Sequence, residues 1–409
     1  MKKTLAIMAW MLLTVLAIQA QVVVSGVVKD RETGQTLNRV SISAEGFKVH
    51  TVSNEDGRFV LKLPTLPKYI LLSHIGYKTR QQSLTEGKTE ELKILMAPNT
   101  VELNEIFVSI DDPQAILRAA MRRIDKNYPN EPELMRCFYR ETAQRGSRYI
   151  SIAEAVTDMY KTAYGEDISR DAVVIQKGRR LMSMKSKDTL GVKVQGGPVL
   201  PLVVDVAKNS SYLLNEQTLA YCTLHLGVPE KIDDRMHHVL LVEPKAVTPY
   251  PLMGGRLYID QQSLTISRAE LQLDIRDWRT AAEYMLVSKP LGLKFKPKEL
   301  TVVVAYNTDY QGVTRMSYVR NEMRFNCDWK RRLFHHTFTT VSEMVVTDRL
   351  QHGKEARRPK GRSSFGIRER FYDKVEYFED ADFWADYNII EPSESLEHAI
   401  NKLKKKAKD

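Results

Sequence analysis

The sequence is poor in the residues on which disulfide-rich, collagen-like and low-complexity proteins depend. Its 409 residues include only three cysteines, and glycine and proline together number 36. Three cysteines cannot form a disulfide scaffold, and so little glycine and proline excludes collagen-like and low-complexity chains. With 43% hydrophobic and 27% charged residues, the chain has the composition of a globular protein. Its length predicts two or three domains.

Long apolar runs are also scarce, and the one near the N-terminus is too short to span a membrane. Two lysines precede the apolar residues 5–18, and Ala20 offers a small residue before Gln21. This order is typical of a secretory signal peptide, whereas a transmembrane helix needs about 20 apolar residues. We therefore predict a signal peptide at residues 1–20, and a protein that is periplasmic or peripheral to the outer membrane. No cysteine near the cleavage site could accept a lipid.

The mature chain is expected to stay basic. Removal of residues 1–20 leaves 59 basic and 51 acidic residues, a net charge of +8. In an exported protein this charge favours anionic lipid, acidic polysaccharide or an acidic protein partner over nucleic acid.

The three cysteines carry no motif. Cys137, Cys222 and Cys327 lie far apart and form no Cys-x-x-Cys pair. One disulfide with a third free thiol is open, but three buried thiols are favoured because free cysteine is among the most buried residue types.

Residues 21–108 show the pattern of a small β-sandwich. Val40, Ile42 and Ala44 alternate with serines, and Asp56-Gly57 is a hairpin signal between two alternating runs. Seven short antiparallel strands in this space predict a sandwich. The predicted strands are 22–30, 39–45, 48–53, 58–63, 69–75, 77–84 and 91–96.

Four short motifs follow one another in this region. They are SGVVKD at 25–30, TG at 33–34, SNEDGRF at 53–59 and IGYK at 75–78. Their order resembles the carboxypeptidase-regulatory-like domain, although LNRV at 37–40 stands where that family usually has a Pro-Gly turn. The resemblance implies a transthyretin-like sandwich without zinc or catalysis. Such domains often precede bacterial envelope proteins, including TonB-dependent outer-membrane receptors.

A linker helix is predicted within residues 109–130. Asp112 and Pro113 form a helix start, and Ile116, Ala120 and Ile124 recur every four residues. Pro129 ends the pattern. The apolar stripe predicts that this helix packs on a core and exposes its basic side.

Residues 131–348 predict a larger antiparallel sheet, and residues 200–226 within them a helical region. Leu271, Leu273 and Ile275 alternate with polar residues, as in a sheet with one wet face. A helical tail is expected at 371–409. The predicted strands are 238–243, 256–260, 264–275, 282–288, 299–306, 313–326 and 331–347.

Further motifs are spread over this part of the chain. They are NYP at 127–129, FYRE at 138–141, EPK at 243–245, GRLYID at 255–260, ISRAE at 266–270 and FWADYNII at 383–390. They are similar to a family of bacterial envelope proteins of unassigned activity. The resemblance implies a mainly β protein whose regulatory-like domain precedes a curved half-barrel like that of periplasmic lipoprotein carriers. A transmembrane barrel is disfavoured because lysine and arginine intrude on many strand faces.

The sequence offers no convincing catalytic or metal motif. His352 and Glu355 fit His-x-x-Glu but lie in a basic, polar stretch. In a strand, the adjacent pairs 237–238 and 335–336 place one imidazole on each face. Gly254-Gly255 precedes a strand, whereas phosphate-binding loops precede a helix. We predict no cofactor, no metal and no enzymatic activity.

Two functions follow as hypotheses. The first is a non-enzymatic envelope protein, accessory to outer-membrane transport or assembly, that binds a partner or an apolar ligand on the sheet at 256–347, unless helices cover that face. The second is a hydrolase of envelope peptide or glycan that uses Asp274, Asp277 and Glu283.

Residues 349–370 are the strongest charge anomaly. They hold eight lysines and arginines against Glu355 and Glu369. They predict either a solvated loop or a contact with lipopolysaccharide or anionic lipid.

Overall fold

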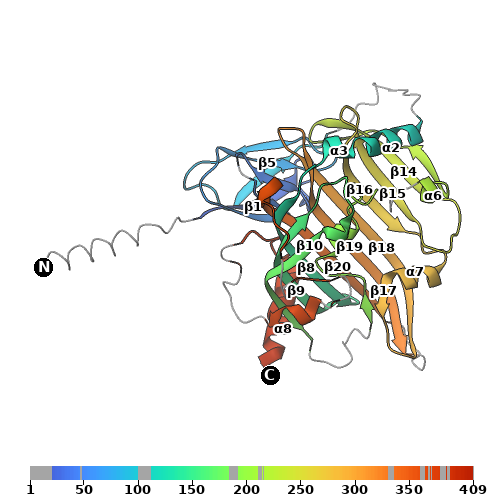
Figure 1. Cartoon of the computed structure of the whole chain (residues 1–409). Helices are drawn as coiled ribbons and strands as arrows, with labels where there is room; N and C mark the ends of the chain where they lie inside the picture. Colours follow the sequence, from blue (N-terminus) through green and yellow to red (C-terminus); the bar gives the residue numbers. More distant parts are fainter. Residues whose placement is uncertain are drawn as a thin grey trace.

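The chain forms a small β-sandwich seated on a large curved sheet, with few helices (Figure 1). The predicted signal peptide at 1–20 lies outside the described residues. The computed structural model describes residues 21–46, 48–99, 112–183, 192–210, 214, 216–329, 336–359, 364–366, 369, 371–377, 384 and 387–408.

All seven strands predicted for the sandwich are present. Alternation places Val28, Phe59 and Leu72 in a closed core, and each is at most 1% exposed. One sheet has the order β4 (Arg58–Leu63), β1 (Val22–Asp30), β7 (Leu92–Met96), and the other β3 (His50–Val52), β2 (Ser41–Ala44), β5 (Tyr69–Ser73), β6 (Arg80–Ser83).

The expectation of purely antiparallel strands is wrong for one pair. β1 and β7 run parallel, with Gly26 opposite Leu92. A Cβ on Gly26 would lie 2.4 Å from the Leu92 carbonyl oxygen, so the close approach of β7 requires glycine there.

The linker is two short helices rather than one. α2 (Pro113–Arg122) starts at Asp112, whose carboxylate accepts a hydrogen bond from the Gln114 N–H, and α3 (Ile124–Asn127) follows a break at Arg123. The predicted apolar stripe is buried.

The second part of the chain forms a 12-stranded sheet that is curved and antiparallel, apart from the parallel pair β10–β21. β13 (Glu230–Ile232) pairs only with β14. In order across the sheet the other strands are β12 (Cys222–Leu226), β14 (Arg235–Pro244), β15 (Met253–Asp260), β16 (Ile266–Leu273), β18 (Leu293–Thr308), β19 (Thr314–Trp329), β20 (Thr337–His352), β8 (Glu133–Arg145), β9 (Arg148–Lys161), β10 (Ala172–Met182) and β21 (Glu376–Tyr377).

Three sequence expectations need correction here. Among its described residues, the predicted helical region 200–226 holds α4 (Leu200–Val203) and α6 (Glu216–Leu219), but its last residues form strand β12. The predicted strand at 282–288 is instead the end of helix α7 (Trp278–Met285), followed by β17 (Leu286–Ser288), which pairs with β11 (Lys193–Val194). Asp277 decides this local choice, because its carboxylate caps the helix.

The third correction concerns the start of the basic segment. Arg349 belongs to β20, which continues to His352 and leads into the short 3-10 helix η4 (Gly353–Glu355). Two other 3-10 turns are η2 (Ile168–Arg170) and η5 (Phe371–Lys374). The first four residues of the segment at 349–370 therefore belong to a strand and not to a loop.

One face of the large sheet, called the apolar face, carries Tyr139, Val304 and Met323 into the main core. α2, α3, α7 and residues 192–210 cover this face (Figure 1). Two buried ion pairs, Lys161–Asp205 and Lys208–Asp171, anchor the segment at 192–210. The chain's own segments thus fill the position where the sequence predicted an apolar groove.

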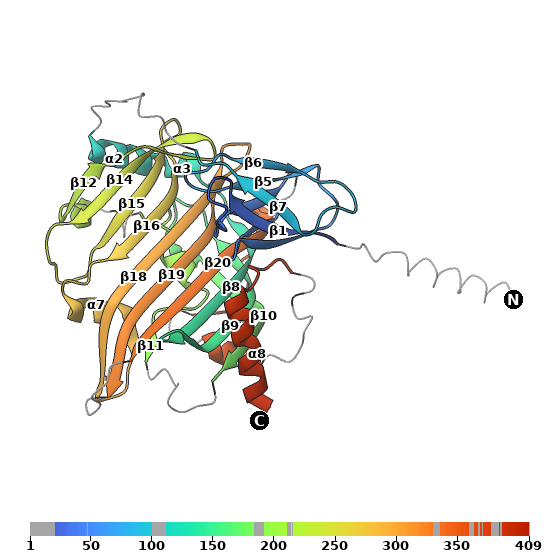
Figure 2. The ribbon, with the colours of Figure 1, turned by 180° about the vertical axis from the view of Figure 1, so that it is seen from behind.

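The opposite face, called the polar face, carries Arg140, Arg320 and Glu343. The sandwich and the C-terminal residues lie over it, and α8 (Glu394–Lys408) packs on β9 and β10 (Figure 2). Val52 of the sandwich joins Phe138, Tyr318 and Trp384 in a small apolar cluster at this junction. The cluster fixes the sandwich on the sheet.

Candidate functional site

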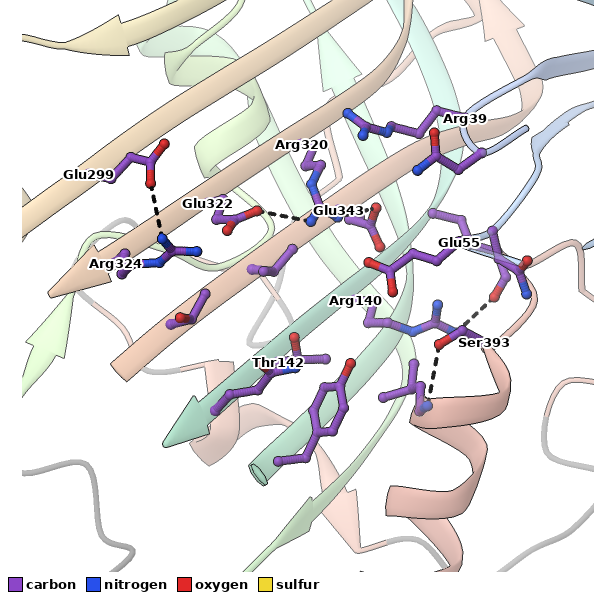
Figure 3. A pocket seen from close by; sticks show the side chains of 18 of the residues that line it. Arg39, Glu55, Arg140, Thr142, Glu299, Arg320, Glu322, Arg324, Glu343 and Ser393 are labelled. Atoms are coloured by element: carbon purple, nitrogen blue, oxygen red, sulfur yellow. Dashed lines mark hydrogen bonds and ion pairs between the residues drawn. The ribbon is translucent and has the colours of Figure 1, made fainter. Parts of the chain in front are cut away.

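A cavity of about 920 Å³ lies where three parts of the chain meet (Figure 3). The polar face of β18, β19, β20 and β8 forms its floor, sandwich residues 38–39 and 53–55 form one wall, and residues 390–396 form another. This volume is within the range of about 300–1,000 Å³ found for small-molecule sites. The site is the candidate binding cavity.

Strand alternation builds the floor. In β19, Arg320, Glu322 and Arg324 point to the polar face, while Met323 and Phe325 point into the core. A period of two therefore gives one strand a charged row and a buried row.

Neighbouring strands align these charges into a ladder. The register places Arg320 opposite Glu343, Glu343 opposite Arg140, Arg140 opposite Glu154, and Glu154 opposite Arg179. Five adjacent strands, β19, β20, β8, β9 and β10, each contribute one residue, and the sign of the charge alternates at every step. These five residues are called the charge ladder, and its three arginines and two glutamates leave each glutamate between two arginines.

The inner end of the ladder is buried. Glu154 is 1% exposed and accepts hydrogen bonds from Arg140 Nε at 2.8 Å, Arg179 Nε at 2.7 Å and Trp384 Nε1 at 3.2 Å. Burial alone would raise the pKa of Glu154, but Arg140 and Arg179 outweigh burial and lower it. The carboxylate is therefore ionised and serves as a structural anchor.

The outer end of the ladder opens into the cavity. Glu343 accepts hydrogen bonds from Tyr318 at 2.7 Å and Arg320 at 2.8 Å, and Arg320 also pairs with Glu322 at 3.0 Å. Burial raises the pKa of Glu343, but Arg320, Tyr318 and Arg140 together lower it by more, so the pKa falls below its usual range. The floor holds fixed charges that already have partners.

The lining as a whole is polar and balanced in charge. It has five basic, five acidic and nine neutral polar residues, one glycine and only three apolar residues. The apolar ones are Val341, Ile390 and Leu396. This composition offers many hydrogen-bonding groups.

The C-terminal wall is tied to both domains. Thr51 Oγ1 donates to the Ile389 carbonyl at 3.1 Å, Asn54 Nδ2 donates to the Pro392 carbonyl at 3.0 Å, and Arg140 donates to the Ile390 carbonyl at 2.8 Å. The Asn388 side chain bonds to the backbone N–H and carbonyl of Lys62. These residues, 388–394, are called the C-terminal strap.

A second polar cavity, of about 1060 Å³, lies on another side of the sandwich. Arg349 lines it and pairs with Asp309 at 3.9 Å, while Arg315 bridges Asp309 and Glu133 at 2.6 Å each. His50 faces the same space, where burial and the nearby Arg349 lower its pKa to about 4.

The residues proposed from the sequence for catalysis serve local structure. Asp274 pairs with Arg276 at 2.6 Å, Asp277 caps α7, and Glu283 is exposed on that helix. Buried His237 bonds to the Arg235 carbonyl and to Ser267 Oγ.

The metal candidates give the same result. His352 and Glu355 are both exposed, His336 bonds to Arg145, and His335 lies outside the described residues. In the part of the chain that the structure describes, no group of three or more His, Cys, Asp or Glu could hold a metal ion.

The prediction of three free, buried thiols is confirmed. Burial raises the pKa of Cys327 to about 11 and raises that of Cys137 further. Across the described residues, no helix has both the length and the apolar character to cross a membrane.

Comparison with known protein families identifies the sandwich. Residues 24–108 match the family model of the CarboxypepD_reg-like domain. The resemblance carried by the glycine motifs at 25–78 is thus confirmed for this fifth of the chain. No curated protein matches the sequence.

Solved structures resemble the chain only distantly. A LolA superfamily protein from Nitrosomonas europaea has 15% identity and a TM-score of 0.20, and covers 58% of this chain and 94% of its own. A DUF1329 family protein from Desulfovibrio piger has 12% identity and a TM-score of 0.22. This match also covers 58% of this chain and 94% of the matched chain. The match to the MucA/MucB complex of Pseudomonas aeruginosa has 14% identity and a TM-score of 0.18. It covers 57% of this chain and 93% of the matched chain. Likeness at this level says nothing of what this protein binds.

Sequence reasoning missed the cavity residues. The spacing of Arg320, Glu322 and Arg324 was visible as an alternating run within a predicted strand. Their partners, Glu343 and Glu299, lie on other strands, and only the sheet register brings them together.

Proposed function

We propose that this chain is a non-enzymatic binding protein of the bacterial envelope whose ligand or partner occupies the candidate binding cavity. One observation carries the proposal: the sandwich, the sheet and the C-terminal strap together line a polar cavity of about 920 Å³. Concave sites between the parts of a chain are common positions for binding.

The envelope location is part of the proposal. It rests on the signal peptide predicted at 1–20 and on the regulatory-like domain at 24–108. The proposal also includes a role as an accessory of outer-membrane transport or assembly. In addition, residues 349–370 would contact anionic lipid or lipopolysaccharide. We also propose the domain division expected from the sequence. It consists of a sandwich at 21–108, a linker at 109–130, a half-barrel domain at 131–348, a basic loop at 349–370 and a helical tail at 371–409.

The experiment is native mass spectrometry of the full chain purified from envelope fractions. The wild-type protein is expected to carry a bound species. Thr339→Trp, on the cavity floor, should displace that species by obstructing the floor, whereas Thr85→Trp, on an exposed sandwich turn, should leave it bound. Protein that is consistently free of ligand, with equal hydrogen exchange at residues 390–396 before and after incubation with envelope extract, would overturn the proposal.

A further inference from the structure

The charges of the cavity floor are already matched to one another. Arg320 holds Glu322 and Glu343, and Arg324 lies 3.7 Å from Glu299 (Figure 3). With five basic and five acidic residues in the lining, the cavity has no excess charge with which to attract an ion. A phosphate or carboxylate group would gain little from entering it.

An apolar occupant fits no better. Only three lining residues are apolar, and the desolvation of the polar ones would not be repaid by a lipid chain. The apolar side of the sheet is filled by the protein's own helices and by residues 192–210.

An extended peptide also lacks its usual means of attachment. Peptides add to sheets through a free strand edge, whereas the cavity lies over the face of β18, β19, β20 and β8, whose backbones pair with one another. The floor offers side chains, not backbone groups.

The side chains that remain are suited to hydroxyl groups. Arginine has five N–H donors in a planar fork, glutamate has two acceptor oxygens, and ion pairing leaves some of these sites unused. Thr142, Thr339 and Gln144 supply both donors and acceptors between the charged residues. Because Arg320 and Glu343 are held in place by their partners, these groups are preorganised for a ligand.

We infer that the candidate binding cavity takes a neutral oligosaccharide, whose hydroxyl groups bond to the paired arginine and glutamate side chains and to the threonines of the floor. This inference rests on the proposed function, since it names the ligand class of the same cavity.

The test uses the full chain and a panel of neutral oligosaccharides (maltohexaose, cellohexaose and chitohexaose), with alginate oligomers as the acidic comparison. Saturable binding of a neutral oligosaccharide is expected by calorimetry. Its affinity should change less than about twofold between about 0.05 M and 0.5 M salt, because no net charge is involved.

Two variants locate the binding. Arg324→Ala should weaken it about tenfold and Thr339→Val about fivefold, as expected for lost hydrogen bonds to a charged and a neutral group. Arg170→Ala removes an arginine from an exposed pair with Glu166, neither of which lines the cavity, and should leave binding unchanged. Arg324 is half exposed, so its loss should not unfold the protein.

The outcomes separate the two proposals. Binding of alginate alone, with steep loss in salt, would overturn the neutral oligosaccharide. A peptide or lipid found in the native mass spectra and displaced by Thr339→Trp would also overturn it but would leave the proposed function intact. An empty protein in both experiments would remove both proposals.

Discussion

Glu154 holds together two buried arginines that come from different strands. Replacing it by glutamine removes the carboxylate that both buried arginines share, so we expect Glu154→Gln to lower the free energy of unfolding by about 3–5 kcal/mol. Glu394→Gln, in an exposed pair with Arg58, should cost at most about 1 kcal/mol. Urea denaturation measures both. Equal effects of the two variants would show that the ladder is not an anchor.

His50 makes stability depend on pH. Burial and Arg349 lower its pKa from 6.5 to about 4, so the folded protein resists a proton that the unfolded chain accepts. The stability present above pH 6.5 should therefore fall as the pH drops from about 6.5 to 4, by up to about 1.4 kcal/mol per pH unit.

His50→Gln should lose this part of the pH dependence, and His352→Gln, an exposed histidine, should keep it. Denaturation curves of the three proteins at pH 7 and pH 5 make the comparison. An unchanged slope in His50→Gln would contradict the assignment.

Single residues of the site could be predicted from the sequence only as a polar row. The alternation at Arg320, Glu322 and Arg324 is local and therefore readable. The charge ladder is not readable, because Arg140 and Glu343 lie about half the chain apart and become neighbours only through the pairing of β20 with β8. Register of this kind depends on which strands pair, and the sequence pattern does not specify that.

At the level of elements, the cap of α7 gives a test that also bears on the hydrolase hypothesis. Asp277 accepts a hydrogen bond from the Arg279 N–H at 3.0 Å, so Asp277→Ala should lower stability by about 1 kcal/mol, while Asp277→Asn should retain the cap. Thermal unfolding of both variants provides the measurement. If both lose the same stability, the carboxylate has another role.

Strands were predicted well where one face of their sheet is exposed to solvent. They were predicted poorly where both faces of the sheet are covered. The strands of the sandwich alternate cleanly, and all seven were found. β8 and β9 have mixed patterns because the strap and sandwich cover one face and the main core covers the other, so periodicity is lost. Residues 282–285 were predicted as strand but belong to α7, because a helix cap, not hydrophobicity, decides their structure.

At the scale of the whole molecule, the sandwich has its own core, separate from that of the sheet. Twelve buried residues, among them Val24, Phe59 and Ile94, form it without help from the second part. We expect the fragment 21–108 to fold alone and to unfold cooperatively on heating. A fragment without a cooperative transition in circular dichroism would show that the sheet and the strap are required.

The strap ties the beginning of the chain to its end. Asn54 and Pro392 are 338 positions apart, as are Asp56 and Glu394, yet each pair is joined by a hydrogen bond. During synthesis the N-terminal sandwich emerges first and can fold early, whereas the wall at 390–396 emerges after the described strands of the sheet. The cavity is consequently the last feature to be completed. A chain that stalls or is clipped before residue 388 would lack the strap and with it one wall of the cavity, so ligand binding would distinguish such a shortened chain from one that reaches residue 396.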